Sequence, residues 1–283
     1  MLEPDRQKTK NVIVCADDFA VNASVSLGIA ELASLGRISA TSVMVLSERW
    51  PQDVAMLRPL RDRIDVGLHL DWTSEFACVA GHGISLGAAM RRALLFGFDY
   101  TQASSVIELQ LDLFEAHWQA PPDYVDGHQH VQQFDGIRQA LVDVLVRRYA
   151  DQLRKPYLRI SRPPSGCSNL KSLVIAWMGA NALEVVVANA CLTSTKALLG
   201  VYDLKDKPAR YGHLMERWLA LSPNQGIIMC HPALAIEPGD EIGAARVQEY
   251  AYLAGTGFAA ALQQAQVRLV RGIDVGTPAK IHR

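Results

Sequence analysis

The stretch Asn11-Val-Ile-Val-Cys-Ala-Asp-Asp-Phe19 decides the fold. A β-branched apolar run at residues 12–14 leads into two adjacent carboxylates, Asp17 and Asp18, and a helical pattern follows from Asn22 to Leu35. A strand, an acidic tip and a helix in this order are typical of α/β enzymes, which carry their chemistry at the carboxyl ends of strands. Adjacent strand residues point to different sides, so we expect the two carboxylates to take different roles.

Composition and charge narrow the class of protein. The chain has 283 residues, of which 49% are hydrophobic and 20% charged, as in an ordinary globular enzyme. A formal net charge of -1 and the lack of a polybasic run argue against a nucleic-acid partner. The five cysteines have no CxxC spacing and predict reduced thiols. With no signal-peptide pattern and no long apolar run, we expect a cytoplasmic enzyme without a membrane span.

Strand and helix patterns alternate along the chain. We expect strands near residues 12–16, 38–46, 64–70, 124–130, 157–160, 194–201, 226–230 and 267–270, with helices between them. This alternation predicts parallel strands with crossover helices. Because polar motifs end several strands, a distorted (β/α) barrel of the TIM type fits better than an open sheet. We expect a disordered lead-in over residues 1–10 and a single barrel domain over residues 11–283.

Four polar groups interrupt the apolar strands: Asp17-Asp18, His69, Asp126/His128/His130 and His231. Each has an ordinary structural interpretation, such as a helix cap for the acidic pair or a hydrogen-bonded core histidine for His69. Together they would be costly to bury without a partner, and one divalent cation can pair with several of them. One carboxylate and two imidazoles leave coordination positions open for water and substrate. Alternation along residues 124–130 predicts that Asp126, His128 and His130 point to the same side.

The motif order DDF-x(2)-N, GLHL, DGHQHV, YLRI and MCHP resembles that of the YdjC-like carbohydrate deacetylases. That family includes chitooligosaccharide deacetylases and a hopanoid-biosynthesis deacetylase, and the resemblance runs from Val12 to Ile273. It implies a distorted barrel, a divalent metal and hydrolysis of N-acetyl groups on amino sugars, in an oligosaccharide or a glycolipid.

The resemblance also assigns roles to individual residues. It implies that Asp18, His69 and one histidine of the 128/130 pair bind the metal, and we favour His128 over His130. It implies that Asp17 is the catalytic base and that His231 faces it as the acid. We expect substrate contacts at Asn22, His130 and Arg159. Zinc suits two imidazoles and one carboxylate best, and Mg, Mn, Co and Ni stay open.

Three residues depart from the family pattern. Ala20 follows Phe19 where the family usually has glycine, Gln132 replaces a third histidine, and Ala233 replaces the glycine of HPG. None is a proposed ligand, so we expect metal binding to be retained while the fit of the sugar could change. Two alternatives stay open: another metal-dependent hydrolase such as a phosphoesterase, or an inactive sugar-binding homologue. The apolar region from Leu170 to Cys191 is either core or a partner surface, which leaves a homodimer open.

Overall fold

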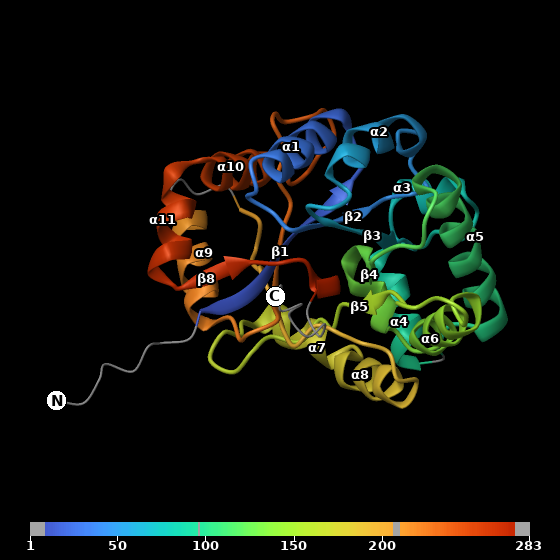
Figure 1. Ribbon diagram of the computed structural model, residues 1–283. Coiled ribbons are helices and arrows are strands. Elements are labelled where there is room, and N and C mark those ends of the chain that lie inside the picture. The colour runs from blue at the N-terminus through green and yellow to red at the C-terminus, as the bar shows by residue number, and fades with distance from the viewer. Residues whose placement is uncertain (1–8, 96, 206–209, 275–283) are drawn as a thin grey trace, which may run out of the picture.

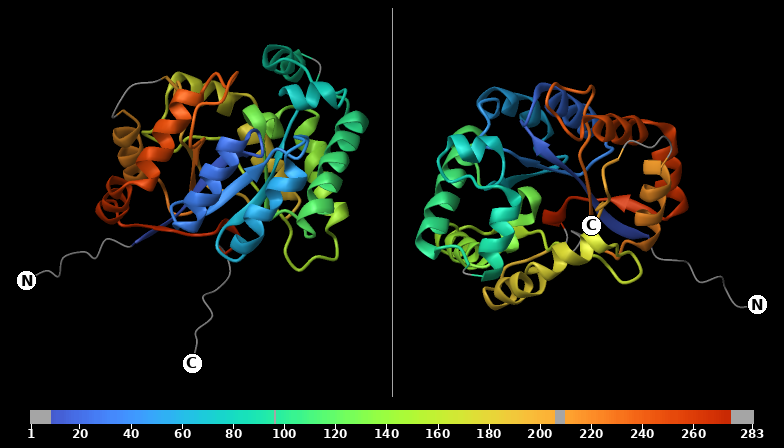
Figure 2. Two further views of the ribbon diagram at one scale, coloured as in Figure 1. Left: turned by 90° about the horizontal axis from the view of Figure 1, so that it is seen from above. Right: turned by 180° about the vertical axis from the view of Figure 1, so that it is seen from behind.

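Eight parallel strands form one curled sheet, which is enclosed by helices (Figures 1 and 2). The structure, a computed structural model, describes residues 9–95, 97–205 and 210–274. The strands are β1 Lys10–Phe19, β2 Ala40–Val43, β3 Asp65–Leu70, β4 Tyr124–Gly127, β5 Tyr157–Leu158, β6 Leu198–Leu199, β7 Gly226–Cys230 and β8 Val267–Leu269. Their order is β5-β4-β3-β2-β1-β7-β6, and β8 pairs with the first residues of β1.

The two ends of the sheet meet through the segment before β6. Leu158 of β5 forms a parallel bridge with Ser194, and the Leu198 N–H donates to the Arg162 carbonyl at 2.7 Å. The sheet therefore curls into a distorted barrel in a single domain, as the sequence predicted. The strands are shorter than expected at residues 38–46 and 194–201, where regular pairing covers only β2 and β6.

Helices fill the connections between the strands. The α-helices are α1 Ala23–Ser34, α2 Trp50–Leu57, α3 Glu75–Val79, α4 Leu86–Leu95, α5 Tyr100–Trp118, α6 Ile137–Arg148, α7 Leu170–Trp177, α8 Ala180–Asn189, α9 Arg210–Leu221, α10 Gly243–Ala254 and α11 Thr256–Gln264. Short 3₁₀ segments are η1 Arg58–Leu60, η2 His128–Gln133 and η3 Gly272–Asp274. Of the expected lead-in, residues 1–8 lie outside the described residues, and Lys10 already belongs to β1.

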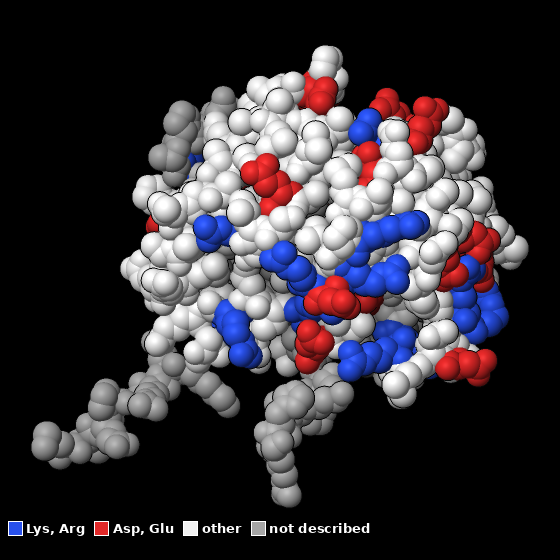
Figure 3. All heavy atoms as spheres, turned by 45° about the horizontal axis from the view of Figure 1, so that its top comes forward, with Lys and Arg blue, Asp and Glu red and all other residues white. Residues whose placement is uncertain are grey.

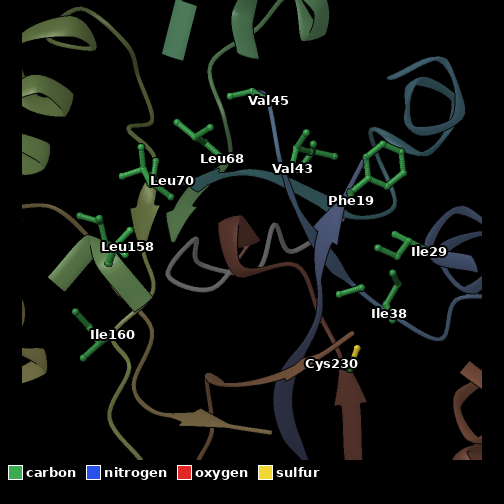
Figure 4. Close-up of a cluster of buried hydrophobic side chains, with 14 of the residues drawn as sticks. Phe19, Ile29, Ile38, Val43, Val45, Leu68, Leu70, Leu158, Ile160 and Cys230 are labelled. Carbon is green, nitrogen blue, oxygen red and sulfur yellow. The ribbon is translucent and has the colours of Figure 1, made fainter. Parts of the chain in front are cut away.

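Alternation along the strands separates two apolar clusters. In β1, Val12 and Val14 pack in the larger cluster between the barrel and the helices, whereas Ile13 and Cys15 pack in a smaller cluster inside the barrel. Figure 4 labels members of the larger cluster: Phe19, Ile29, Ile38, Val43, Val45, Leu68, Leu70, Leu158, Ile160 and Cys230. The same parity directs Asp17 inward, because it follows Cys15 by two residues.

No single helix within the described ranges is long and apolar enough to cross a membrane. The bent pair α7 and α8 meets that criterion jointly, by length and composition only, with 44° between the two helices. On the face shown in Figure 3, acidic and basic side chains are interspersed. That mixture agrees with the near-zero formal net charge of the chain.

Candidate metal centre and active site

A backbone irregularity turns both adjacent carboxylates toward one site. The register between β1 and β2 shifts between Ala16 and Phe19, and Asp18 has a φ of 68°. A left-handed φ is uncommon for a residue other than glycine and is often found at functional sites. Asp17 and Asp18 consequently line the same cavity. The expectation that they point to different sides is wrong, because simple alternation fails at a bulge.

Asp18, His69 and His128 converge at the carboxyl ends of β1, β3 and β4. The Asp18 Oδ1 atom lies 3.4 Å from His69 Nε2 and 3.2 Å from His128 Nδ1. One donor atom from each of the three residues lies within 4.8 Å of the other two. Two imidazole nitrogens and one carboxylate oxygen are a donor set that suits a catalytic divalent cation.

A second carboxylate orients the His69 ring. Asp126 Oδ1 lies 2.5 Å from His69 Nδ1, and the Ser42 hydroxyl lies 3.0 Å from the same nitrogen. With Nδ1–H donated to Asp126, Nε2 faces Asp18 and can bind a metal once it has lost its proton, as in histidines that bind metal. Burial opposes the charged ring, but the Asp126 carboxylate outweighs it and raises the pKa of His69 to about 10.

The two histidines of the DGHQH motif separate after β4. The strand ends at Gly127, and η2 begins at once, with positive φ values at Gln129 (53°) and His130 (64°). The expected strand over residues 124–130 is therefore too long, and the histidines do not alternate along it. His128 faces Asp18, whereas the Nδ1 atom of His130 lies 3.1 Å from the Ser161 hydroxyl.

Arg159 pairs with the other carboxylates of the site. Its Nη1 atom lies 2.7 Å from Asp17 Oδ1 and 2.8 Å from Asp126 Oδ2. All three side chains are buried. Burial alone would raise the pKa of Asp17, but the Arg159 guanidinium holds it well below its usual range. Asp17 is therefore ionised at neutral pH and can accept a proton.

His231 follows β7 and completes the ring of polar side chains around the cavity. Its backbone N–H donates to Glu249 Oε2 at 2.5 Å, and the Tyr202 hydroxyl donates to Glu249 Oε1 at 2.6 Å. Burial lowers the pKa of His231 to about 4, so its imidazole is neutral at pH 7. Burial also raises the pKa of Glu249 to about 7.

Sequence reasoning missed Arg246 and Glu249, which both lie on α10. Arg246 Nη2 lies 2.7 Å from Asp18 Oδ2, and its Nε lies 2.9 Å from Asp240. Burial would raise the pKa of Asp18, but Arg246 and the two neighbouring histidines hold it well below normal. The sequence of α10 gave no signal for this pair, because only the structure shows that both side chains are buried, which is unusual for either residue type without a partner.

Three other residues of interest have local structural contacts. Asn22 caps α1, where its Oδ1 accepts the Val25 N–H at 2.9 Å, and it is absent from the described residues that line the cavity. A substrate contact for Asn22 stays a prediction. Gln132 is buried and donates to the Arg159 carbonyl and the Ser161 hydroxyl, both at 3.1 Å. Ala20 has a φ of 74°, a conformation that glycine adopts without strain, which explains the usual family residue.

The site opens into a cavity of about 530 Å³. The strand ends and the residues just after them supply one group of its polar side chains: Asp17, Asp18, His69, His128, His130, Arg159 and His231. Other segments add further polar lining residues: Gln129, Gln133, Lys171, Tyr202, Asp240, Glu241 and Arg246. Helices α4 and α7 supply much of its apolar wall with the side chains of Leu86, Met90, Val174 and Ile175, and Met178 follows directly after α7. A cavity of this volume, with convergent polar groups and apolar walls, is typical of small-molecule sites.

Comparison with known proteins identifies the family. A model of the YdjC-like protein family matches residues 11–264, and the chain belongs to that family. A Homo sapiens protein named carbohydrate deacetylase is 27% identical over 173 residues, which are 57% of this chain and 52% of that protein. A Proteus mirabilis (strain HI4320) chitooligosaccharide deacetylase is 26% identical over 172 residues, 57% of this chain and 63% of that protein. The matches thus span between half and two thirds of these relatives.

A solved structure shares the fold over nearly the whole chain. A crystal structure from Enterococcus faecalis V583, proposed to be a cellobiose-phosphate cleavage protein, has a TM-score of 0.69 and 18% sequence identity. The match covers 95% of this chain and 100% of that chain. At this identity the likeness concerns the fold alone.

Proposed function

We propose that this protein is a metal-dependent hydrolase that removes an N-acetyl group from an amino sugar. The observation that carries the proposal is the convergence of Asp18, His69 and His128 donor atoms beside Asp17 at one end of the barrel. Membership of the YdjC-like family and the deacetylase names of two relatives support the choice of substrate.

The residues present fit a divalent cation. Asp18 Oδ1 lies close to both ring nitrogens, and the His69–Asp126 hydrogen bond leaves Nε2 of His69 available as a ligand. Asp18, His69 and His128 would hold the ion, with zinc favoured and Mg, Mn, Co or Ni as alternatives. When bound, such a cation polarises an amide carbonyl and lowers the pKa of water.

The chain's own residues divide the proton transfers. Asp17, kept ionised by Arg159, takes a proton from water as the water oxygen attacks the acetamide carbonyl carbon. The C–N bond then breaks, and His231 protonates the leaving amine, which yields acetate and a free amino sugar. Because His231 is neutral at pH 7, the proton that it gives to the amine is first taken up from solvent, and Asp17 returns its own proton to solvent when acetate leaves.

The phosphoesterase alternative is less compatible with the side chains around Asp17. Two-metal phosphoesterases need a second set of free ligands close to the first. Here Asp17 and Asp126 both pair with the Arg159 guanidinium. This positively charged side chain lies where a second metal ion would need to bind the two carboxylates. Release of acetate, and not phosphate, from a panel of substrates separates the two activities, and an inactive binding homologue would release neither.

The test combines metal analysis with acetate release from short N-acetylglucosamine oligomers and N-acetylglucosaminyl lipids. We expect Asp18→Ala and His69→Ala to lose bound metal and activity together. Val146→Ala, an exposed residue on α6 away from the cavity, is the control and should change neither. Full activity of either ligand variant after removal of metal with a chelator would refute the proposal.

A further inference from the structure

Helix α7 presents its apolar stripe to solvent. Leu170, Leu173, Val174 and Trp177, at helical spacing i, i+3, i+4 and i+7, are 79%, 52%, 38% and 69% exposed. The one fully buried residue of α7 is Ser172. A surface helix of a globular protein normally turns its apolar stripe toward the core. The reversed orientation of α7 therefore indicates that something outside the barrel covers it.

Helix α4 repeats this arrangement on the same cavity. Leu86, Met90 and Leu94 are spaced four residues apart, and Leu86 and Met90 line the cavity while Leu94 is exposed. In the left view of Figure 2, α4 (teal) and α7 (yellow) both lie toward the top of the molecule. Val174 of α7 both lines the cavity and is exposed. The apolar wall of the cavity is thus continuous with apolar surface outside it.

The charges of these two helices have one sign. Arg91 and Arg92 lie on α4 and Lys171 lies on α7, and neither helix sequence contains Asp or Glu. The Lys171 ammonium also donates to the Tyr202 carbonyl at 3.1 Å, and the acidic residues that line the same cavity, Asp240 and Glu241, lie outside both helices. An anionic lipid surface complements such a surface, because each nearby cation adds to the attraction. A second copy of the chain paired through the same face would bring these cations together. The exposed Trp177 is also of the residue type that favours the membrane–water interface.

We propose that α4 and α7 dock the cavity mouth onto an anionic lipid surface. Apolar side chains of both helices would enter the headgroup region, as in an interfacial amphipathic helix. The proposal rests on the proposed function in one respect: docking brings the sugar headgroup of a lipid to Asp17 and Asp18, with its apolar part against Val174 and Met90. Binding to the lipid surface itself requires no catalysis.

The test measures binding of the full chain to phosphatidylcholine vesicles with and without phosphatidylglycerol. We expect binding to the anionic vesicles that weakens as salt is added. Leu173→Asp/Trp177→Asp should bind at least about tenfold more weakly, since it removes two exposed apolar groups. The control Leu109→Asp/Leu153→Asp changes two exposed leucines on α5 and before β5, and it should bind as the unmodified protein does.

Trp177 provides a readout that does not depend on a charged substitution. The other four tryptophans, Trp50, Trp72, Trp118 and Trp218, are buried, so a vesicle-induced shift of emission reports on Trp177. We expect a blue shift on the anionic vesicles and its loss in Trp177→Phe.

Three outcomes would overturn the proposal. The first is that the protein binds neither kind of vesicle. The second is that Leu173→Asp/Trp177→Asp and its control bind the anionic vesicles equally well. The third is that the emission shift persists in Trp177→Phe. A dimer that dissociates in the double variant, with vesicle binding unchanged, would assign the face to a second copy. Acetate release from a soluble N-acetylglucosamine oligomer is measured separately. If no acetate is released from that substrate, the proposed function is refuted, and the conclusion about vesicle binding does not change.

Discussion

Replacing Asp126 with asparagine should weaken metal binding while the barrel remains folded. Asp126 touches no proposed substrate atom, yet its Oδ1 lies 2.5 Å from His69 Nδ1 and its Oδ2 lies 2.8 Å from Arg159. The amide keeps the shape and one acceptor but loses the charge that fixes the His69 ring. Loss of such an outer partner typically costs about 10–100-fold in metal affinity. That range corresponds to about 1.4–2.8 kcal/mol of binding free energy.

The assay is chelator competition with Zn²⁺ or Co²⁺, followed by acetate release at saturating metal. Asp65→Asn is the matched control, because Asp65 is likewise a buried carboxylate but lies at the first residue of β3, away from the metal ligands, and pairs with Arg271. Both variants should lose some stability, and only Asp126→Asn should lose metal affinity. Equal metal affinity in the unmodified protein and Asp126→Asn would refute the orienting role of this carboxylate.

Further predictions concern catalysis, pH and stability. Asp17→Asn should retain metal and lose at least about 100-fold in turnover, measured as acetate release, and an active variant would remove Asp17 from the role of base. His231→Ala should likewise keep its metal while turnover falls, and unchanged turnover would exclude it as the acid. With its pKa raised to about 10, His69 is protonated in the metal-free protein, so metal binding should release about one proton and tighten as pH rises toward 10. Calorimetry in buffers of different ionisation enthalpy counts that proton. Without metal, the His69–Asp126 pair stabilises the fold fully below the unfolded-state pKa of about 6.5, and this contribution is lost as pH rises through 10. Trp50→Ala, at a buried ring that stacks on Phe114, should lower the free energy of unfolding by about 3–5 kcal/mol in urea titration.

Sequence patterns predicted the barrel because apolar strand segments alternate with helices and end in polar residues at their carboxyl ends. The same signal singled out four polar groups, and the family resemblance then favoured Asp18, His69 and His128 among them as ligands. The structure brings one donor atom from each of these three residues within 4.8 Å of the other two. Strand parity also directs His69 inward, since the flanking Leu68 and Leu70 pack in the outer cluster.

The rest depends on local backbone geometry that residue types do not reveal. Alternation could not predict the shift at Asp17–Asp18 or the left-handed residues of η2, because each breaks the parity on which the rule relies. Arg246 and Glu249 were overlooked because α10 has an ordinary helical pattern, and only its packing shows that both side chains are buried. The sequence of α7 likewise showed only that the helix is apolar, and not that its apolar side chains face solvent.

The most direct test of the central claim is anomalous X-ray scattering from crystals grown with Zn²⁺ or Co²⁺. The account predicts one strong peak within bonding distance of Asp18, His69 and His128, and its loss in Asp18→Ala crystals. A peak at His130 in place of His128, or an ion bound away from Asp18, would contradict it.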